Sequence, residues 1–180
     1  MKATGIVRRI DDLGRVVIPK EIRRTLRIRD GDPLEIFTEK DGEVIFKKYS
    51  PMGDLHELAG RVCEAVQKNL GFTAAISDRD TVIAASGQKR KELMDRRLTA
   101  GVIRRLEDRE RYSWRGKGSA CPLVENGETA LGAAAPILSE GDLIGGVFLT
   151  ADPERRKFPG ELEEKLIDIL AVILGKQVEN

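Results

Sequence analysis

Arginine side chains are concentrated near the N-terminus of this 180-residue chain. Nine Lys/Arg and three Asp/Glu fall in residues 1–29, a net charge of +6, whereas the whole chain carries only +1. A guanidinium presents a planar fork of N–H donors that fits phosphate groups and guanine edges. The three acids Asp11, Asp12 and Glu21 could pair with some of these cations but cannot neutralise nine. Residues 4–28 therefore predict a basic surface for a polyanion, built on Arg8, Arg9, Arg15, Arg23, Arg24 and Arg27.

Few other residues could support catalysis. His56 is the single histidine and stands near the start of a predicted helix, where a solvated side chain is the expected role. Cys63 falls on the apolar face of that helix, and Cys121 opens a predicted strand. Neither cysteine has metal-ligand spacing or a histidine neighbour in sequence that could serve as its base. We predict no catalytic residue, no metal and no cofactor, with a redox role for the cysteines as the alternative.

Short elements must position the arginines. Residues 3–10 and 15–18 are predicted strands joined by a turn at 11–14, and Pro19 opens a helix that runs to about Arg27. Residues 34–38 and 44–49 form a hairpin about Asp41-Gly42. About fifty residues without disulfide or metal bury too little surface to be stable alone, which favours a dimer.

The run Leu13-Gly14-Arg15-Val16-Val17-Ile18-Pro19, within residues 1–51, resembles the AbrB-type swapped-hairpin DNA-binding domain of bacterial transition-state regulators. The resemblance implies a dimer in which two protomers exchange hairpins to complete one small barrel. It implies duplex DNA as the partner and Arg8, Arg9, Arg15, Arg23 and Arg24 as the DNA-facing residues. It also implies a transcription regulator that activates some sporulation genes and represses others.

Residues 50–53, Ser-Pro-Met-Gly, predict a boundary between a DNA-binding domain at 1–53 and a second domain at 54–180. The second domain reads as a helix at 54–70 with Asp54 as N-cap and Gly71 after its end, strands at 73–77 and 81–85, and a helix over 89–111 that is weak at Gly101. Strands at 120–124, 129–138 and 143–151 and a final helix from about 160 follow. This α+β layout, with an antiparallel sheet and both terminal helices on one face, is similar to a GAF domain.

Two features of the second domain leave alternatives open. Small residues at 132–136 and at Gly145 and Gly146, with Ala135 opposite Gly146, favour either a tightly packed helix or a site for an unidentified small effector. The final helix has more aliphatic residues than one sheet face needs, including Ile167 and Val172. We expect this helix to assemble the protein into a homotetramer. The charge run 88–91 is interpreted as a solvated loop or helix entry.

The chain has no apolar run near the ~20 residues that span a bilayer and nothing like a signal peptide, so we expect a cytoplasmic, nucleoid-associated protein without membrane contact. The competing class is an antitoxin or scaffold whose barrel recruits protein partners. Antitoxins that share the barrel carry a disordered acidic tail, whereas residues 54–180 have the periodicity of a globular domain. This pattern favours the DNA-binding regulator.

Overall fold

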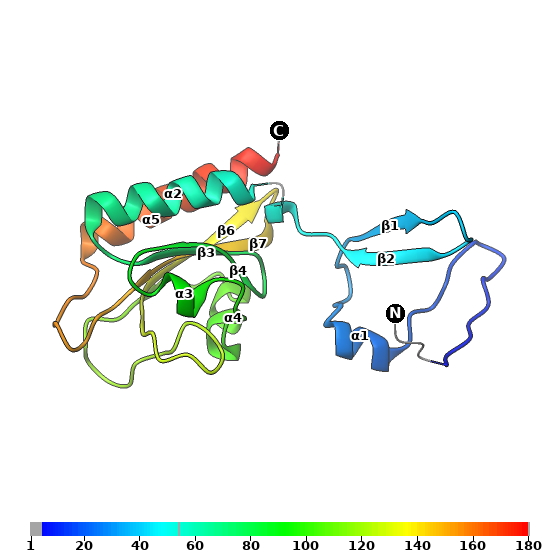
Figure 1. The fold of residues 1–180 in the computed structure, drawn as a ribbon, viewed down its shortest axis with the longest axis horizontal. Helices are drawn as coiled ribbons and strands as arrows, with labels where there is room; N and C mark the ends of the chain where they lie inside the picture. Colours follow the sequence, from blue (N-terminus) through cyan, green and yellow to red (C-terminus); the bar gives the residue numbers. More distant parts are fainter. Residues whose placement is uncertain (1–4, 54, 180) are drawn as a thin grey trace. The chain divides into compact units, whose positions relative to one another are not determined.

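The computed structural model describes residues 5–53 and 55–179, which form two compact units, Met1–Tyr49 and Ser50–Asn180 (Figure 1). The first unit holds helix α1 (Lys20–Leu26) and an antiparallel hairpin of β1 (Leu34–Thr38) and β2 (Val44–Lys48). Thr38 pairs with Val44 across the turn, where Gly42 takes a positive φ of 81°. The predicted hairpin about Asp41-Gly42 is therefore confirmed.

The predicted strands at 3–10 and 15–18 differ from the structure. The turn between them is present, since Asp11 N–H donates to Arg15 O at 3.0 Å and Gly14 N–H to Asp11 O at 2.9 Å. Within residues 5–18, however, no strand ladder extends from this turn, and Ala3 and Thr4 lie outside the described residues. A strand exists only where a second segment supplies the paired N–H and C=O groups. No segment of the described chain does so here.

The second unit is a five-stranded antiparallel sheet in the order β4-β3-β7-β6-β5. Its strands are β3 (Ala74–Ser77), β4 (Val82–Ser86), β5 (Tyr112–Ser113), β6 (Leu131–Ser139) and β7 (Asp142–Thr150). A 3-10 turn, η1 (Pro51–Gly53), precedes the long helix α2 (His56–Leu70), and α5 (Glu161–Val178) ends the unit. The predicted N-cap Asp54 lies outside the described residues, whereas Gly71 takes the expected left-handed conformation at the end of α2.

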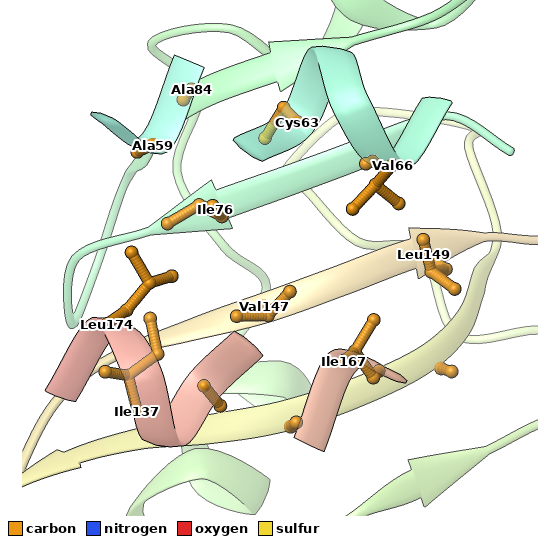
Figure 2. Close-up of a cluster of buried hydrophobic side chains, with 14 of the residues drawn as sticks. Ala59, Cys63, Val66, Ile76, Ala84, Ile137, Val147, Leu149, Ile167 and Leu174 are labelled. Carbon is orange, nitrogen blue, oxygen red and sulfur yellow. The ribbon is translucent and has the colours of Figure 1, made fainter. Parts of the chain in front are cut away.

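Helices α2 and α5 cover one face of the sheet, as predicted, and α3 (Arg90–Leu93) and α4 (Ala100–Glu107) cover the other (Figure 1). Alternate residues of β3 serve the two cores: Ala74 and Ile76 face α2 and α5, and Ala75 faces α3 and α4. Figure 2 shows the first core, in which Ile167 and Leu174 of α5 meet strands β6 and β7. Ile167 is buried, so the expectation that it is spare surface on α5 is wrong.

The single helix predicted at 89–111 is also wrong, because segment 94–99 leaves helical geometry between α3 and α4. Asp95 has a φ of 58°, and its N–H donates to Val82 O at 3.1 Å, while Val82 N–H donates to Arg96 O at 2.9 Å. These bonds to the start of β4 replace the helical ones. Gly101, the expected weak point, lies inside α4.

Segment 120–124 makes only isolated bridges, at Pro122 and Val124, in place of the predicted strand. Proline has no N–H for a ladder, which accounts for the interruption. The hairpin of β6 and β7 turns at Glu140-Gly141, both at positive φ, one residue before the predicted turn at Gly141-Asp142. Two contacts hold this turn: Glu140 N–H donates to a Glu179 carboxylate oxygen at 3.0 Å, and Arg109 donates to Gly141 O at 2.6 Å.

Candidate nucleic-acid interface

Helix α1 carries Arg23 and Arg24. Pro19 precedes it with a φ of −56°, so its ring suits the helix start and its missing N–H costs no bond. The helix ends when Arg27 turns left-handed at a φ of 53°, where Arg27 N–H donates to Arg24 O and Ile28 N–H to Arg23 O. This paired closure fixes the direction in which the chain leaves the helix. Arg24 is exposed, and Arg23 is half-buried beside Asp30, to which it is ion-paired.

Arg15 follows the 11–14 turn, and its side chain is held by Asp11. The Asp11 carboxylate accepts from Arg15 N–H at 2.8 Å and from Arg15 Nε at 2.7 Å, and also from Leu13 N–H at 3.0 Å. The backbone and side-chain bonds from Arg15 hold the pKa of Asp11 below its usual value. Asp11 therefore acts as a support for a basic side chain. From the sequence alone, Asp11 is expected only as an acid that could compete for the arginines. The spacing of four residues between Asp11 and Arg15 is the feature that could have predicted this contact.

Arg8 and Arg9 lie on the other arm of the same turn, and both are exposed. Arg8 Nη1 donates to the neighbouring Val7 O at 3.2 Å. The five predicted residues thus come from two places, the arms of the 11–15 turn and α1. Four of the five are exposed.

The aliphatic residues of this unit are also exposed, which is unusual for a folded domain. Helix α1 has no buried residue, and Val7 is 84% exposed. Along the described part of the unit, from Gly5 to Tyr49, only Pro19 is buried when the whole residue, backbone included, is considered. The other large exposed residues are Ile6, Ile10, Leu13, Val16, Val17, Leu26, Ile36, Phe37, Val44, Phe46 and Tyr49. So many exposed apolar residues in one small unit call for a partner.

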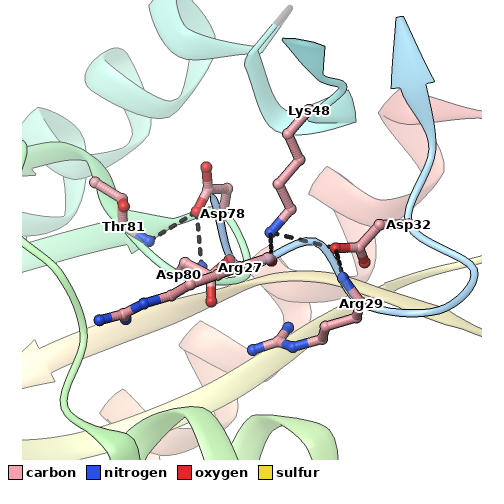
Figure 3. Close-up of polar contacts among 7 residues, drawn as sticks. All are labelled: Arg27, Arg29, Asp32, Lys48, Asp78, Asp80 and Thr81. Carbon is pink, nitrogen blue, oxygen red and sulfur yellow. Dashed lines mark hydrogen bonds and ion pairs between the residues drawn. The ribbon is translucent and has the colours of Figure 1, made fainter. Parts of the chain in front are cut away.

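Polar contacts fix the base of α1 to the hairpin (Figure 3). Lys48 Nζ reaches Arg27 O and a carboxylate oxygen of Asp32, each at 3.5 Å. The same Asp32 oxygen accepts from Arg29 N–H at 2.9 Å, and the Asp32 side chain is only 1% exposed. A buried carboxylate needs such partners. In the second unit, an equivalent device is the Asp78 carboxylate, which accepts from the Asp80 and Thr81 N–H groups.

Of the candidate reactive residues of the second unit, Cys63 is unsuited to nucleophilic catalysis. Burial raises the pKa of the Cys63 thiol to about 12, with Glu64 adding to the effect, so the nucleophilic thiolate is scarce at neutral pH. Cys121 is half-buried and lies 3.7 Å from Pro122 O, and His56 is exposed. Among the described residues, no group of His, Cys, Asp and Glu could hold a metal ion.

The patch of small residues is more tightly filled than the sequence indicated. A bulge between Ile137 and Leu138 shifts the register, so Ala135 lies opposite Val147 and Pro136 opposite Gly146, one residue away from the predicted pairing. A Cβ at Gly146 would meet the Phe148 ring at 2.6 Å and Leu106 at 3.0 Å, and one at Gly145 would collide with Ser77 O. Neighbouring atoms of the protein therefore fill the space beside these two glycines. This favours close packing of the fold over an effector site at this patch.

No helix among the described residues is long and apolar enough to cross a membrane.

Two families match the chain. The one described as "Stage V sporulation protein T C-terminal, transcription factor" matches residues 54–179, and the one described as "Antidote-toxin recognition MazE, bacterial antitoxin" matches residues 7–54. Stage V sporulation protein T of Bacillus subtilis (strain 168) is 44% identical over 181 residues, covering 99% of each chain. Transition state regulatory protein AbrB of the same organism is 61% identical over 51 residues, which cover 28% of this chain and 52% of AbrB.

The solved structure of an A. aeolicus GAF domain superposes with a TM-score of 0.52 at 17% identity, covering 74% of this chain and 87% of the other. The two predictions of fold class, an AbrB-type N-terminal segment and a GAF-like C-terminal domain, are confirmed.

Proposed function

The chain belongs to the stage V sporulation protein T family, and from that premise we propose that it regulates the transcription of sporulation genes by binding duplex DNA through its N-terminal unit. The observation that carries the proposal is the exposed set of arginines on α1 and on the arms of the 11–15 turn. DNA phosphates occur at regular spacing, and guanine edges accept bidentate arginine contacts. One basic face can thus both position the duplex and read it.

Within this proposal, Arg8, Arg9, Arg15, Arg23 and Arg24 contact the DNA. Arg8, Arg9, Arg15 and Arg24 are exposed, and the Asp11 carboxylate limits the rotamers of Arg15 before DNA arrives. A side chain ordered in advance loses less entropy when it binds. Arg23 is ion-paired with the exposed carboxylate of Asp30 in the free protein. On binding, a DNA phosphate would replace that carboxylate as the partner of Arg23.

The same proposal makes the N-terminal unit a homodimer. Exchange of hairpins between two protomers would supply partners for the 5–18 segment and cover the exposed aliphatic residues at once. The unpaired backbone of residues 5–18 and many of the exposed aliphatic side chains belong to the same segment, which supports one interface that satisfies both. Since about fifty residues rarely fold stably alone, dimerisation and folding are coupled here.

A homotetramer forms, in this view, through the helices of the second unit. Helix α5 leaves Leu162, Ile169, Val172 and Ile173 between 53% and 71% exposed. These residues recur at helical spacing and form one stripe. The functional division is then a DNA-binding domain at residues 1–53 and a GAF-like domain at 54–180 that adds assembly.

We also propose that the protein is not an enzyme and that it acts in the cytoplasm, associated with the nucleoid. The family is described as a transcription factor, and Cys63 is too basic a thiol to serve as a nucleophile. The MazE match keeps an antitoxin or scaffold role as the second candidate, since it covers the segment that both classes share. The folded second unit argues against it, because an antitoxin tail that wraps a toxin is disordered when free.

The decisive experiment is fluorescence anisotropy of the full-length protein on duplexes from sporulation promoters, at several salt concentrations. We expect a linear fall of log affinity with log salt, since bound phosphates release counterions. Tight, salt-insensitive binding, or no binding to any duplex, would contradict the proposal.

A further inference from the structure

The second unit carries a basic surface of its own, which we call the basic end surface. It is formed by four segments that meet at the end of the unit where α2 stops and α5 starts (Figure 1): residues 68–73, 87–91, 114–118 and 152–158. Its cations are Lys68, Lys89, Arg90, Lys91, Arg115, Lys117, Arg155, Arg156 and Lys157.

Direct contacts join the four segments into one surface. Lys157 Nζ donates to Gly71 O at 2.6 Å and lies 4.5 Å from the centre of the Phe72 ring. Lys89 N–H donates to Thr73 Oγ1 at 3.3 Å, which attaches segment 87–91 to the same strand start. The Phe158 ring packs edge-on against Trp114, with 5.4 Å between ring centres. Three contacts therefore link the four segments, one of them made by the exposed Lys157 ammonium itself.

The local charge is far from that of the whole chain. The four segments contain nine Lys/Arg against Asp152 and Glu154, a net of +7 in a chain of +1. The flanking carboxylates Glu92, Glu161, Glu163 and Glu164 reduce this to +3. Hydrogen bonds from other segments of the chain occupy the carboxylates of Glu92, Glu163 and Glu164.

Glu92 accepts from the Glu128 and Thr129 N–H groups at 2.8 and 2.7 Å. Glu163 accepts from Gly160 N–H at 2.9 Å. Glu164 accepts from Ser113 Oγ at 2.6 Å and from Arg115 at 3.0 Å. Three of the cations are ion-paired, Lys89 with Glu92, Arg115 with Glu164 and Arg155 with Asp152. Lys91, Lys117 and Arg156, by contrast, are exposed and form no ion pair with another described residue.

A rigid turn presents two of the arginines. Asp152 and Lys157 exchange backbone hydrogen bonds of 2.9 and 2.8 Å, and Arg156 sits inside this turn at a φ of 50°. Few residues other than glycine adopt this conformation without cost. The turn therefore holds Arg155 and Arg156 at its tip.

We propose that the basic end surface is a second DNA-binding surface, which contacts the phosphates of duplex flanking the site held by the N-terminal unit. The inference rests on the proposed function. Several cations on a backbone fixed by packing fit a partner that presents regularly spaced negative charge. A second contact on the same molecule strengthens binding by raising the effective concentration of the flanking DNA.

The test uses the full-length protein and two duplexes: the shortest one that wild type binds, and the same site with flanking sequence on both sides. The variant is Lys91→Gln, Lys117→Gln and Arg156→Gln together. A matched control removes three cations from other faces of the same unit, Arg61→Gln, Arg104→Gln and Lys165→Gln. Circular dichroism and sedimentation establish that both proteins keep the fold and assembly of wild type.

On the flanked duplex, three lost phosphate contacts should lower the magnitude of the salt slope by about 2.7. The affinity deficit of the variant should then be about 40-fold larger at 50 mM than at 200 mM salt. On the minimal duplex, variant, control and wild type should bind alike.

Wild-type binding to both duplexes with an unchanged slope for the variant would overturn the inference and leave the proposed function standing. An equal loss in the control would also overturn it, since the effect would then be one of net charge. If that unchanged slope came with loss of binding to phosphatidylglycerol vesicles, the surface would belong to a lipid headgroup instead. Failure of wild type to bind either duplex would overturn the proposed function and this inference together.

Discussion

The Asp11 carboxylate binds Arg15 twice, through the backbone N–H at 2.8 Å and through Nε at 2.7 Å. An acid beside a proposed DNA-binding arginine would ordinarily weaken its attraction for phosphate. Here the same acid closes the turn and fixes the arginine above it. The pair is exposed, so its value lies in geometry more than in Coulomb attraction.

The first prediction concerns the arginines of α1. Replacing Arg23 and Arg24 together by Ala should weaken DNA binding strongly and lower the magnitude of the salt slope by about 1.8, since each phosphate contact contributes about 0.9. Anisotropy at graded salt measures both quantities. The double variant Lys40→Ala and Lys47→Ala removes the same charge from the hairpin and should change binding little. Equal losses in both variants would show that only net charge matters.

The second prediction concerns pH. Because bonds from Arg15 lower the pKa of Asp11 in the folded protein, the support that Asp11 gives to the turn is complete above its ordinary pKa and is lost as pH falls through the lowered value. Carboxyl NMR titration should find Asp11 below its ordinary pKa, and Arg15→Ala should raise that pKa part of the way back. The recovery is partial because the Arg15 backbone N–H remains. If Arg15→Ala left the pKa of Asp11 unchanged, the Arg15 side chain would not be what lowers it.

The third prediction concerns the isolated first domain. A fragment of residues 1–53 should fold as a dimer, because a single copy leaves Val7, Leu13 and Val17 exposed. It should bind DNA more weakly than the full chain, which gains from joined subunits. Light scattering and circular dichroism across a dilution series give mass and fold together. A folded monomer at low concentration would refute the coupling of folding to dimerisation.

The fourth prediction concerns the exposed stripe of α5. Val172→Glu should reduce a tetramer to dimers that bind a single DNA site almost normally but lose cooperative binding to paired sites. Arg104→Glu, on an exposed position of α4 across the sheet, is the control for charge and should leave assembly intact. Sedimentation velocity at micromolar concentration reports both. Wild type that sediments only as a dimer would exclude this role for the stripe.

The fifth prediction concerns Gly175, where α5 touches the end of β6. An added Cβ would collide with Leu138 O, a backbone atom that cannot turn aside. Gly175→Ala should therefore destabilise the unit by about 1–3 kcal/mol, the usual cost of overpacking. Gly60→Ala in α2, where a Cβ meets nothing within 4 Å, should be neutral or stabilising by up to about 1 kcal/mol. Urea denaturation of both variants makes the comparison.

Local signals in the sequence were sufficient for several elements. The Asp41-Gly42 turn and the periodicity of α2 and α5 depend on residues that are close together in sequence, so the sequence alone predicts these parts of the fold. The same holds for the arginines of the candidate interface, whose type and spacing are visible directly.

Other features depend on contacts between distant segments. The break between α3 and α4 arises because residues 95 and 96 bond to Val82, and no local pattern at Asp95 announces it. The bulge at Ile137 and Leu138 shifts the predicted pairing by one residue, and β5 exists only because Tyr112 and Ser113 meet the edge of β6. The basic end surface was likewise invisible, since its cations are spread over ninety residues and appear in sequence as separate solvated loops.

The Glu140-Gly141 turn has a consequence for how the second unit transmits motion. It is gripped from two sides, by Glu179 just after α5 and by Arg109 just after α4. Glu140 bonds to Glu179 and the adjacent Gly141 bonds to Arg109, so two neighbouring residues join the end of α5 to the segment that follows α4, on the opposite face of the sheet. Movement of the last turn of α5 would therefore act on the opposite face of the sheet through these two bonds, without a ligand.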